Sequence, residues 1–181
     1  MRYNGTCCDL RLVELSDAQD ILDLRLNPRL NKHLSSTRND LSAQEEWIKA
    51  YKGREAAGAE YYFITLDKTG HSVGTRSIHN IDYSAKTYTS GSWIVMENMD
   101  IRISVESVLA SDMLAFRHFG LEEKQFDVRK ANKFVVRFHK KMGAVIVAED
   151  ELNYYFKLPR DSYEIYLGSI TNIIALGEFV L

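Results

Sequence analysis

The stretch VRKANKFVVRFHKKMGAVIVAED, Val128–Asp150, contains the clearest change of periodicity in the chain. After Asn132 apolar residues recur at helical spacing, and Asn is among the residues that most often begin a helix. The pattern stops at Gly143, and glycine commonly ends a helix because it adopts a positive φ without strain. A strand-like apolar segment follows at once. The stretch therefore predicts a helix from Asn132 to Met142 and then a strand, with Asn132 and His139 two helical turns apart.

The sequence on either side extends this pattern into a mixed fold. The predicted order is β-α-α-β-β-β-α-β-α-β-β, which combines hairpins with crossover connections. We therefore expect an α+β fold with a mixed, mostly antiparallel central sheet flanked by helices. The segments, in order, are CDLRLVEL, SDAQDILDLRLN, LSAQEEWIKAYKGRE, YYFITLD, SVGTRSIHNID, TYTSGSWIVM, residues 103–119, KQFDVR, residues 132–142, AVIVAED and ELNYYFKL.

The domain organisation is read from length and linkers. The chain has 181 residues, two prolines and no Gly/Ser-rich linker, which favours a single domain over residues 1–181. An apolar C-terminal extension covers about residues 164–181. Because a free apolar tail would be a liability, we expect it to be buried as an added strand, a packed helix or a contact in a homodimer.

Charge and cysteine content restrict the class of protein. The formal net charge is −2, so the overall balance gives no reason to expect nucleic acid or an anionic membrane as a partner. No stretch approaches the roughly 18 apolar residues of a membrane span, and the N-terminal residues lack the apolar run of a signal peptide. Cys7 and Cys8 are adjacent, which disfavours a disulfide between them and gives no metal-binding spacing. We expect a cytoplasmic protein with free thiols and no metal.

The segment NKFVVRFHKKMGA resembles a helix of the GNAT N-acetyltransferase superfamily. Members carry an Asn, a small residue three positions on, an aromatic or aliphatic residue six on, then a Tyr, charged residues and a Gly. Asn132, Val135, Phe138, His139 and Gly143 occupy those positions here. The order of elements, LRLVELSDAQDILDLR and HSVGTRSI support the resemblance, which covers roughly residues 10–158. LRLNPRLNKHL, QEEWI and FHKKMGA look most similar to aminosugar N-acetyltransferases and to the nearby ribosomal-protein N-terminal acetyltransferases.

The resemblance implies acetyl-CoA as co-substrate. In the family the third central strand diverges from its neighbour, and its free backbone N–H groups hold the pantetheine arm and polarise the carbonyl. The resemblance also assigns Asn132 and Phe138 to this arm, although Asn132 has a helix N-cap as its alternative role. The diverging segment corresponds here to Trp93, Ile94, Val95 and Met96.

The phosphate-binding loop departs from the family pattern. Members have a Gly-rich loop close to Arg-x-x-Gly-x-Gly, whereas this chain has MENMDIRISVES, without glycine. A helix start still binds phosphate through its N–H groups, so Arg102, Ile103 and Ser104 are the candidates. Glu97 and Asp100 would repel phosphates unless they point away.

Three side chains are candidates for proton transfer. His139 replaces the family Tyr that protonates the thiolate, and imidazole serves either as that acid or as a base for the ammonium group. Its alternative is a surface position, because Phe134, Val135, Phe138 and Met142 are expected to form the buried face of the helix. His79 and Glu97 lie at strand ends where members often carry a base, with His79 preferred; the alternative for His79 is a plain strand-to-turn segment.

The acceptor is the remaining question. Arg25 and Asn27 end the first helix, and in the aminosugar branch this loop borders the acceptor site, where arginine suits the phosphates of a nucleotide carrier. The preferred hypothesis is therefore an N-acetyltransferase acting on a small-molecule amine, a nucleotide-linked amino sugar. The alternatives are an N-terminal acetyltransferase of the ribosomal-protein type and a non-catalytic binding module with the same fold.

Overall fold

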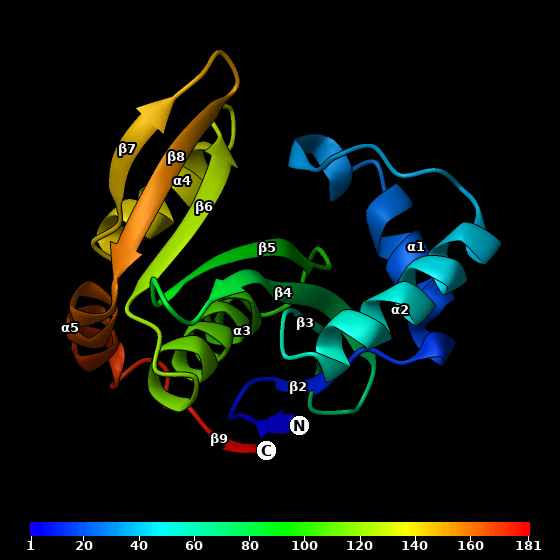
Figure 1. The fold of residues 1–181 in the computed structure, drawn as a ribbon, viewed down its shortest axis with the longest axis horizontal. Helices are drawn as coiled ribbons and strands as arrows, with labels where there is room; N and C mark the ends of the chain where they lie inside the picture. Colours follow the sequence, from blue (N-terminus) through cyan, green and yellow to red (C-terminus); the bar gives the residue numbers. More distant parts are fainter.

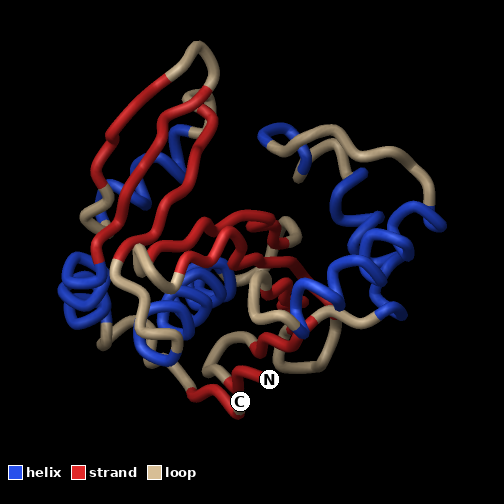
Figure 2. The backbone as a smooth tube through the Cα atoms, in the orientation of Figure 1, coloured by secondary structure: helices blue, strands red, loops and turns tan.

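A nine-stranded sheet runs through the whole molecule (Figures 1 and 2), and the computed structural model describes residues 1–181. The strand order is β7-β8-β6-β5-β4-β3-β2-β1-β9, and all neighbours are antiparallel except β5 and β6. The predicted α+β class with a mostly antiparallel sheet is confirmed. The strands are β1 (Arg2–Asn4), β2 (Asp9–Leu12), β3 (Tyr61–Leu66), β4 (Ser72–Asp82), β5 (Thr87–Val95), β6 (Glu123–Arg129), β7 (Val145–Glu149), β8 (Asn153–Pro159) and β9 (Glu178–Val180).

Helices cover both faces of the sheet. The helices are α1 (Ala18–Leu26), α2 (Leu41–Ala56), α3 (Ile101–Met113), which continues into a π-helical turn (Leu114–His118), α4 (Lys133–Lys141) and α5 (Arg160–Ile170). Strand β3 shows the division: Phe63 packs into the core formed with α3, whereas Tyr62 and Ile64 pack against α1 and α2. This alternation is what a strand buried on both faces requires.

The parallel pair β5 and β6 separates after a short contact. Their pairing ends at Thr89 and Gln125, although β5 continues to Val95 and β6 to Arg129. In Figure 1, β6, β8 and β7 rise together away from β5. The sheet therefore opens between its two central strands, as the sequence resemblance implied.

Strand β5 carries a bulge next to this opening. Thr75 pairs with Ile94 and Ser77 with Gly91, so Arg76 lies opposite both Ser92 and the residue after it. Ser92 has a φ of 49°, in the left-handed region that side chains other than glycine seldom adopt. The Thr75 hydroxyl donates to the Ser92 carbonyl oxygen at 2.7 Å, which holds the bulge in place.

Helix α4 begins and ends as predicted, but its buried face differs from the prediction. Asn132 is the N-cap, its Oδ1 accepting from the Val135 N–H, and Gly143 follows the helix with a φ of 89°. Phe134 is 56% exposed, whereas His139 is only 3% exposed. The predicted buried face was wrong in including Phe134 and in leaving out His139. The reason is that the helix lies over the aromatic side chains of β6 and β8, which enclose the face that carries His139.

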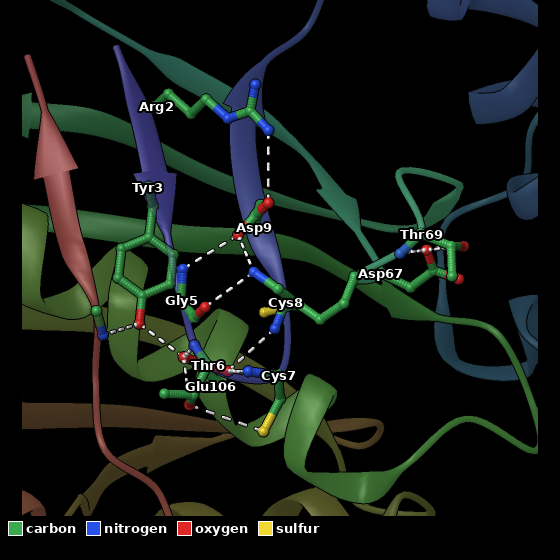
Figure 3. Close-up of polar contacts among 12 residues, drawn as sticks. Arg2, Tyr3, Gly5, Thr6, Cys7, Cys8, Asp9, Asp67, Thr69 and Glu106 are labelled. Atoms are coloured by element: carbon green, nitrogen blue, oxygen red, sulfur yellow. Dashed lines mark hydrogen bonds and ion pairs between the residues drawn. The ribbon is translucent and has the colours of Figure 1, made fainter.

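The chain termini add elements beyond the predicted order. The tail forms both a helix, α5, and a strand, β9, which pairs with the additional strand β1. Figure 3 shows how the loop between β1 and β2 is attached to α3: the buried Glu106 carboxylate accepts hydrogen bonds from the Tyr3 hydroxyl, the Thr6 hydroxyl and three backbone N–H groups. Cys7 and Cys8 lie in this loop as free thiols.

Candidate active site

A cavity of about 360 Å³ occupies the opening between β5 and β6. Its walls come from the strands on both sides of the gap, from α1 and the segment after it, and from α4 with its N-cap. The lining residues are Arg25, His33, Leu34, Ser35, Arg76, Ser90, Gly91, Ser92, Trp93, Phe126, Asp127, Val128, Arg129, Asn132, Val135 and His139.

His139 lies in an aromatic wall of this cavity. Its ring centroid is 4.3 Å from that of Phe126 and 5.8 Å from that of Trp93, and its Nδ1 is buried without a hydrogen-bond partner. Burial, followed by the positive charges of Lys124 and Arg76, holds the pKa of His139 well below its ordinary value of 6.5. The imidazole is therefore neutral at neutral pH and available as a proton acceptor.

A buried charge cluster lies directly behind this wall. Asp112 of α3 accepts from the Lys124 ammonium at 2.7 Å and from the Tyr88 hydroxyl at 3.0 Å. Arg76 donates from Nε to the Ser111 hydroxyl at 2.9 Å, while its Nη2 lies 3.6 Å from Asp112, within ion-pair reach but too far for a hydrogen bond. Nη2 is buried and has no hydrogen-bond partner. Two cations thus share one carboxylate. The whole cluster is buried, because the side chains of Arg76, Lys124 and Asp112 are 2%, 0% and 0% exposed.

The backbone of β5 is open on the side that β6 leaves free. Ile94 pairs with β4, and Met96 donates its N–H to the Val73 carbonyl at 2.8 Å, so by alternation the groups of Val95 face the opening. The Met96 N–H is therefore not a free amide, contrary to expectation, and the Ile94 side chain is buried in the core. Trp93 lines the cavity.

Helix α4 supplies the opposite wall. Asn132 caps the helix, which is one of its two predicted roles. It also lines the cavity. Phe138 packs on Trp93, with ring centroids 5.4 Å apart, and reinforces the aromatic wall.

The start of α3, the predicted phosphate position, is capped by the protein itself. Asp100 accepts from the Arg102 N–H at 2.9 Å and from the Arg102 guanidinium Nε at 2.8 Å, so it points toward the helix start rather than away. The Ile103 side chain is buried against Cys8 and Val73 and offers only its backbone. Ser104 is half-buried, in the first turn of the same helix.

The other predicted residues are divided between the cavity and its surroundings. Arg25 lines the cavity and donates to the hydroxyls of Thr37 and Ser35, whereas Asn27 faces a separate hollow at the end of α1. Glu97 lies at that same hollow, paired with Arg29 at 3.1 Å. The structure therefore does not bring Asn27 or Glu97 to the opening.

His79 lies in a neighbouring hollow between α2 and β4. Burial lowers the pKa of His79, and its Nδ1 is 3.3 Å from the Ser77 hydroxyl. Ser92 borders both this hollow and the cavity, so the bulge of β5 is where the two meet.

The sequence reasoning missed Arg76 and Arg129 in the cavity, and Lys124 and Asp112 behind it. The sequence offers a weak signal only for Asp112, a charge in the mostly apolar stretch that follows Val108, whereas Arg76 and Lys124 stand in strands with many polar residues. Arg129 is half-buried and forms no ion pair, a feature that only the three-dimensional arrangement shows.

Comparison with known proteins identifies the family. Residues 9–145 match the family model described as an acetyltransferase (GNAT) domain, so the chain belongs to the GNAT family of acetyltransferases and is an enzyme of that class. The structure is similar to that of apo FdhC, described as a nucleotide-linked sugar GNAT: the TM-score is 0.87 and the identity 35%, over 97% of this chain and 99% of the other.

A second solved structure shares the fold at lower identity. Spermidine N-acetyltransferase from Vibrio cholerae, in complex with CoA and spermine, has a TM-score of 0.71 and 16% identity, over 87% of this chain and 98% of the other. A comparison with curated protein sequences finds no match. No helix of the structure has both the length and the apolar character needed to cross a membrane.

Proposed function

We propose that this enzyme transfers an acetyl group from acetyl-CoA to the amino group of a nucleotide-linked sugar. The observation that carries the proposal is the cavity between the diverging strands β5 and β6, which three arginines line. Acyl transfer needs a positioned thioester, a neutral amine and a proton acceptor. The cavity offers features suited to each requirement.

The thioester arm fits the open side of β5. The backbone of Val95 faces the gap, and Trp93 with Phe138 provides an apolar wall for the pantetheine chain. Asn132 lies across the opening. The N–H groups at the start of α3 suit the diphosphate, although Asp100 must release its cap or share it through Arg102. Acetyl-CoA would supply the activated acyl group.

His139 is the proposed proton acceptor. Because its pKa is held well below 6.5, the His139 ring is neutral and accepts a proton from the amine nitrogen as this nitrogen attacks the carbonyl, whereas little imidazolium is present to donate one. His79 is the second candidate, from the hollow beyond Ser92. Glu97 has no such place, because its carboxylate is paired with Arg29 outside the cavity.

The acceptor class follows from the charges at the mouth of the cavity. Arg25 and Arg129 come from opposite sides of the opening, and Arg129 has no acidic partner to satisfy it. Guanidinium groups bind phosphate in a bidentate manner, so a diphosphate-linked sugar matches this pair. The 35% identity with a nucleotide-linked sugar GNAT supports the same acceptor.

Two measurements test the proposal. Thermal unfolding should show stabilisation by acetyl-CoA, about 2.7 kcal/mol at a hundredfold excess over the dissociation constant. Thiol release should then be followed with nucleotide-linked amino sugars, with the same sugars lacking the nucleotide, and with acceptor peptides. Turnover restricted to the nucleotide-linked sugars, with a raised KM for them in Arg129→Gln, supports the proposal. Turnover with peptides alone would overturn it in favour of an N-terminal acetyltransferase.

A further inference from the structure

We propose that the buried cluster of Arg76, Asp112 and Lys124 is an electrostatic element of the active site, which stabilises the thiolate released when the thioester is cleaved. The inference rests on the proposed function, because it concerns the same cavity and the same co-substrate. It assigns a role to Arg76, which lies in the cavity lining, and to Asp112 and Lys124 behind it, none of which the proton-transfer chemistry uses.

The charges of the buried cluster do not balance. Two buried cations, Arg76 and Lys124, share the single carboxylate of Asp112, and no other acidic group is hydrogen-bonded to either of them. One positive charge is therefore uncompensated among side chains that are 2% exposed or less. An uncompensated buried charge is costly to folding, and it attracts any negative charge that forms nearby.

Arg76 connects the buried cluster with the cavity. Arg76 lies in the lining of the cavity, opposite the bulge of β5, and its guanidinium carbon is 5.8 Å from the centroid of Trp93. Its Nη2 is buried without a hydrogen-bond acceptor. Nη2 faces Asp112 at 3.6 Å, so only a long ion pair balances the guanidinium charge on that side, while the Arg76 side chain also borders the cavity.

Cleavage of the thioester produces an anion on sulfur. The amine nitrogen attacks the thioester carbonyl carbon, a C–N bond forms, the C–S bond breaks, and its electron pair remains on sulfur as a thiolate. His139 accepts the proton of the amine, so the thiolate is not protonated in the same step. A nearby uncompensated cation lowers the energy of that anion, and the charges of Lys124 and Arg76 add to the burial that already lowers the pKa of His139.

The cavity also holds other charged groups that a bound thiolate would face. They are Arg25 from α1, His33 from the loop after α1, Arg76 from β4, Asp127 and Arg129 from β6 and His139 from α4, with Lys124 of β6 behind them. Burial lowers the pKa of Lys124 to about 8, so Lys124 titrates close to a thiol. Variants at both cations are therefore needed to separate the contributions.

The pKa of the CoA thiol bound to the enzyme tests the inference without any acceptor. Thiolate absorbance in the ultraviolet reports this pKa, and calorimetry first confirms that CoA binds. We expect the bound thiol to titrate about one pH unit or more below free CoA, as an adjacent opposite charge produces. Arg76→Gln should remove most of this difference, Arg76→Lys should retain part of it, and Arg117→Gln, which removes a surface arginine paired with Glu164, should leave it unchanged.

The outcomes separate the two proposals. Binding of CoA with the thiol pKa of free CoA, or an equal lowering in Arg76→Gln, would overturn the electrostatic role while leaving the proposed function intact. Absence of CoA binding would overturn the proposed function together with this inference. If Arg76→Gln fails to fold, the comparison of bound with free CoA in the natural enzyme still decides, and Lys124→Met, which removes the other cation, should raise the bound pKa.

Discussion

Replacing Lys124 with Met should make the protein more stable at neutral pH and remove a component of its pH dependence. Lys124 is fully buried, and burial lowers its pKa from the ordinary 10.5 to about 8 despite the attraction of Asp112. The folded protein therefore holds this proton less tightly than the unfolded chain. Between these two pKa values the unfolded state binds more protons, so stability rises with pH.

The size of the effect follows from the two pKa values. The interval from about 8 to 10.5, at 1.36 kcal/mol per pH unit, gives roughly 3 kcal/mol as the penalty for keeping Lys124 charged in the fold. Below pH 8 the penalty is present in full. By pH 9.5 about 2 kcal/mol of it should have been recovered in the natural protein. Lys124→Met has no such charge, and Met fills a similar volume.

Urea unfolding at pH 7, 8, 9 and 9.5 provides the measurement, with the stability of Lys124→Met minus that of the natural protein as the quantity of interest. This difference removes contributions common to both proteins, such as the buried tyrosines. We expect it to fall by about 2 kcal/mol between pH 7 and 9.5. A difference that is constant with pH would show that Lys124 is not strained by its burial, and the uncompensated-charge argument would fail with it.

Three further substitutions test other parts of the structure. Glu106→Gln should destabilise the protein by about 1–3 kcal/mol in urea unfolding, because the amide cannot accept all the hydrogen bonds from the loop after β1; a loss under about 0.5 kcal/mol would contradict this. Gly143→Ala should cost about 1–2 kcal/mol in the same assay, since φ is 89° and an added Cβ would lie 2.9 Å from the Cβ of Ser162. His139→Ala should lower turnover by about a hundredfold or more while acetyl-CoA affinity, measured by calorimetry, changes far less; unchanged turnover would remove His139 from the mechanism.

The elements of this fold were predictable because they depend on local chemistry. Gly143 and Gly120 end their helices with positive φ, and the change from helical to alternating periodicity marks β3 to β5. The position of His139 was not predictable in the same way. A helical wheel assigns burial from the apolar residues of the helix itself. In α4 the aromatic rings of Trp93 in β5 and Phe126 in β6 enclose the histidine beside the opening.

The charge cluster was beyond sequence reasoning for a different reason. Arg76 and Asp112 are far apart in the sequence, and only the packing of α3 against β4 and β5 brings them together. Asp112 stands in a largely apolar helix and Arg76 in a strand with many polar residues, and a single sequence does not indicate which charges meet. The resemblance implied that β5 separates from its neighbour, which the structure confirms because this opening depends on topology, and it gave no information on side chains specific to this chain.

The cluster is better explained by the active site than by folding. Replacing a buried ion pair with apolar residues of similar size often leaves a protein equally or more stable. Folding therefore does not require a second cation, Lys124, beside the pair of Arg76 and Asp112. Lys124 adds a charge that the fold holds at a cost of roughly 3 kcal/mol at neutral pH, a large part of the usual stability of a domain. Stability alone would favour an apolar residue there. The proposed stabilisation of a thiolate in the cavity would give the buried lysine a function. The two measurements on Lys124→Met should therefore change in opposite directions. The variant should be more stable toward urea, and the pKa of its bound CoA thiol should be higher.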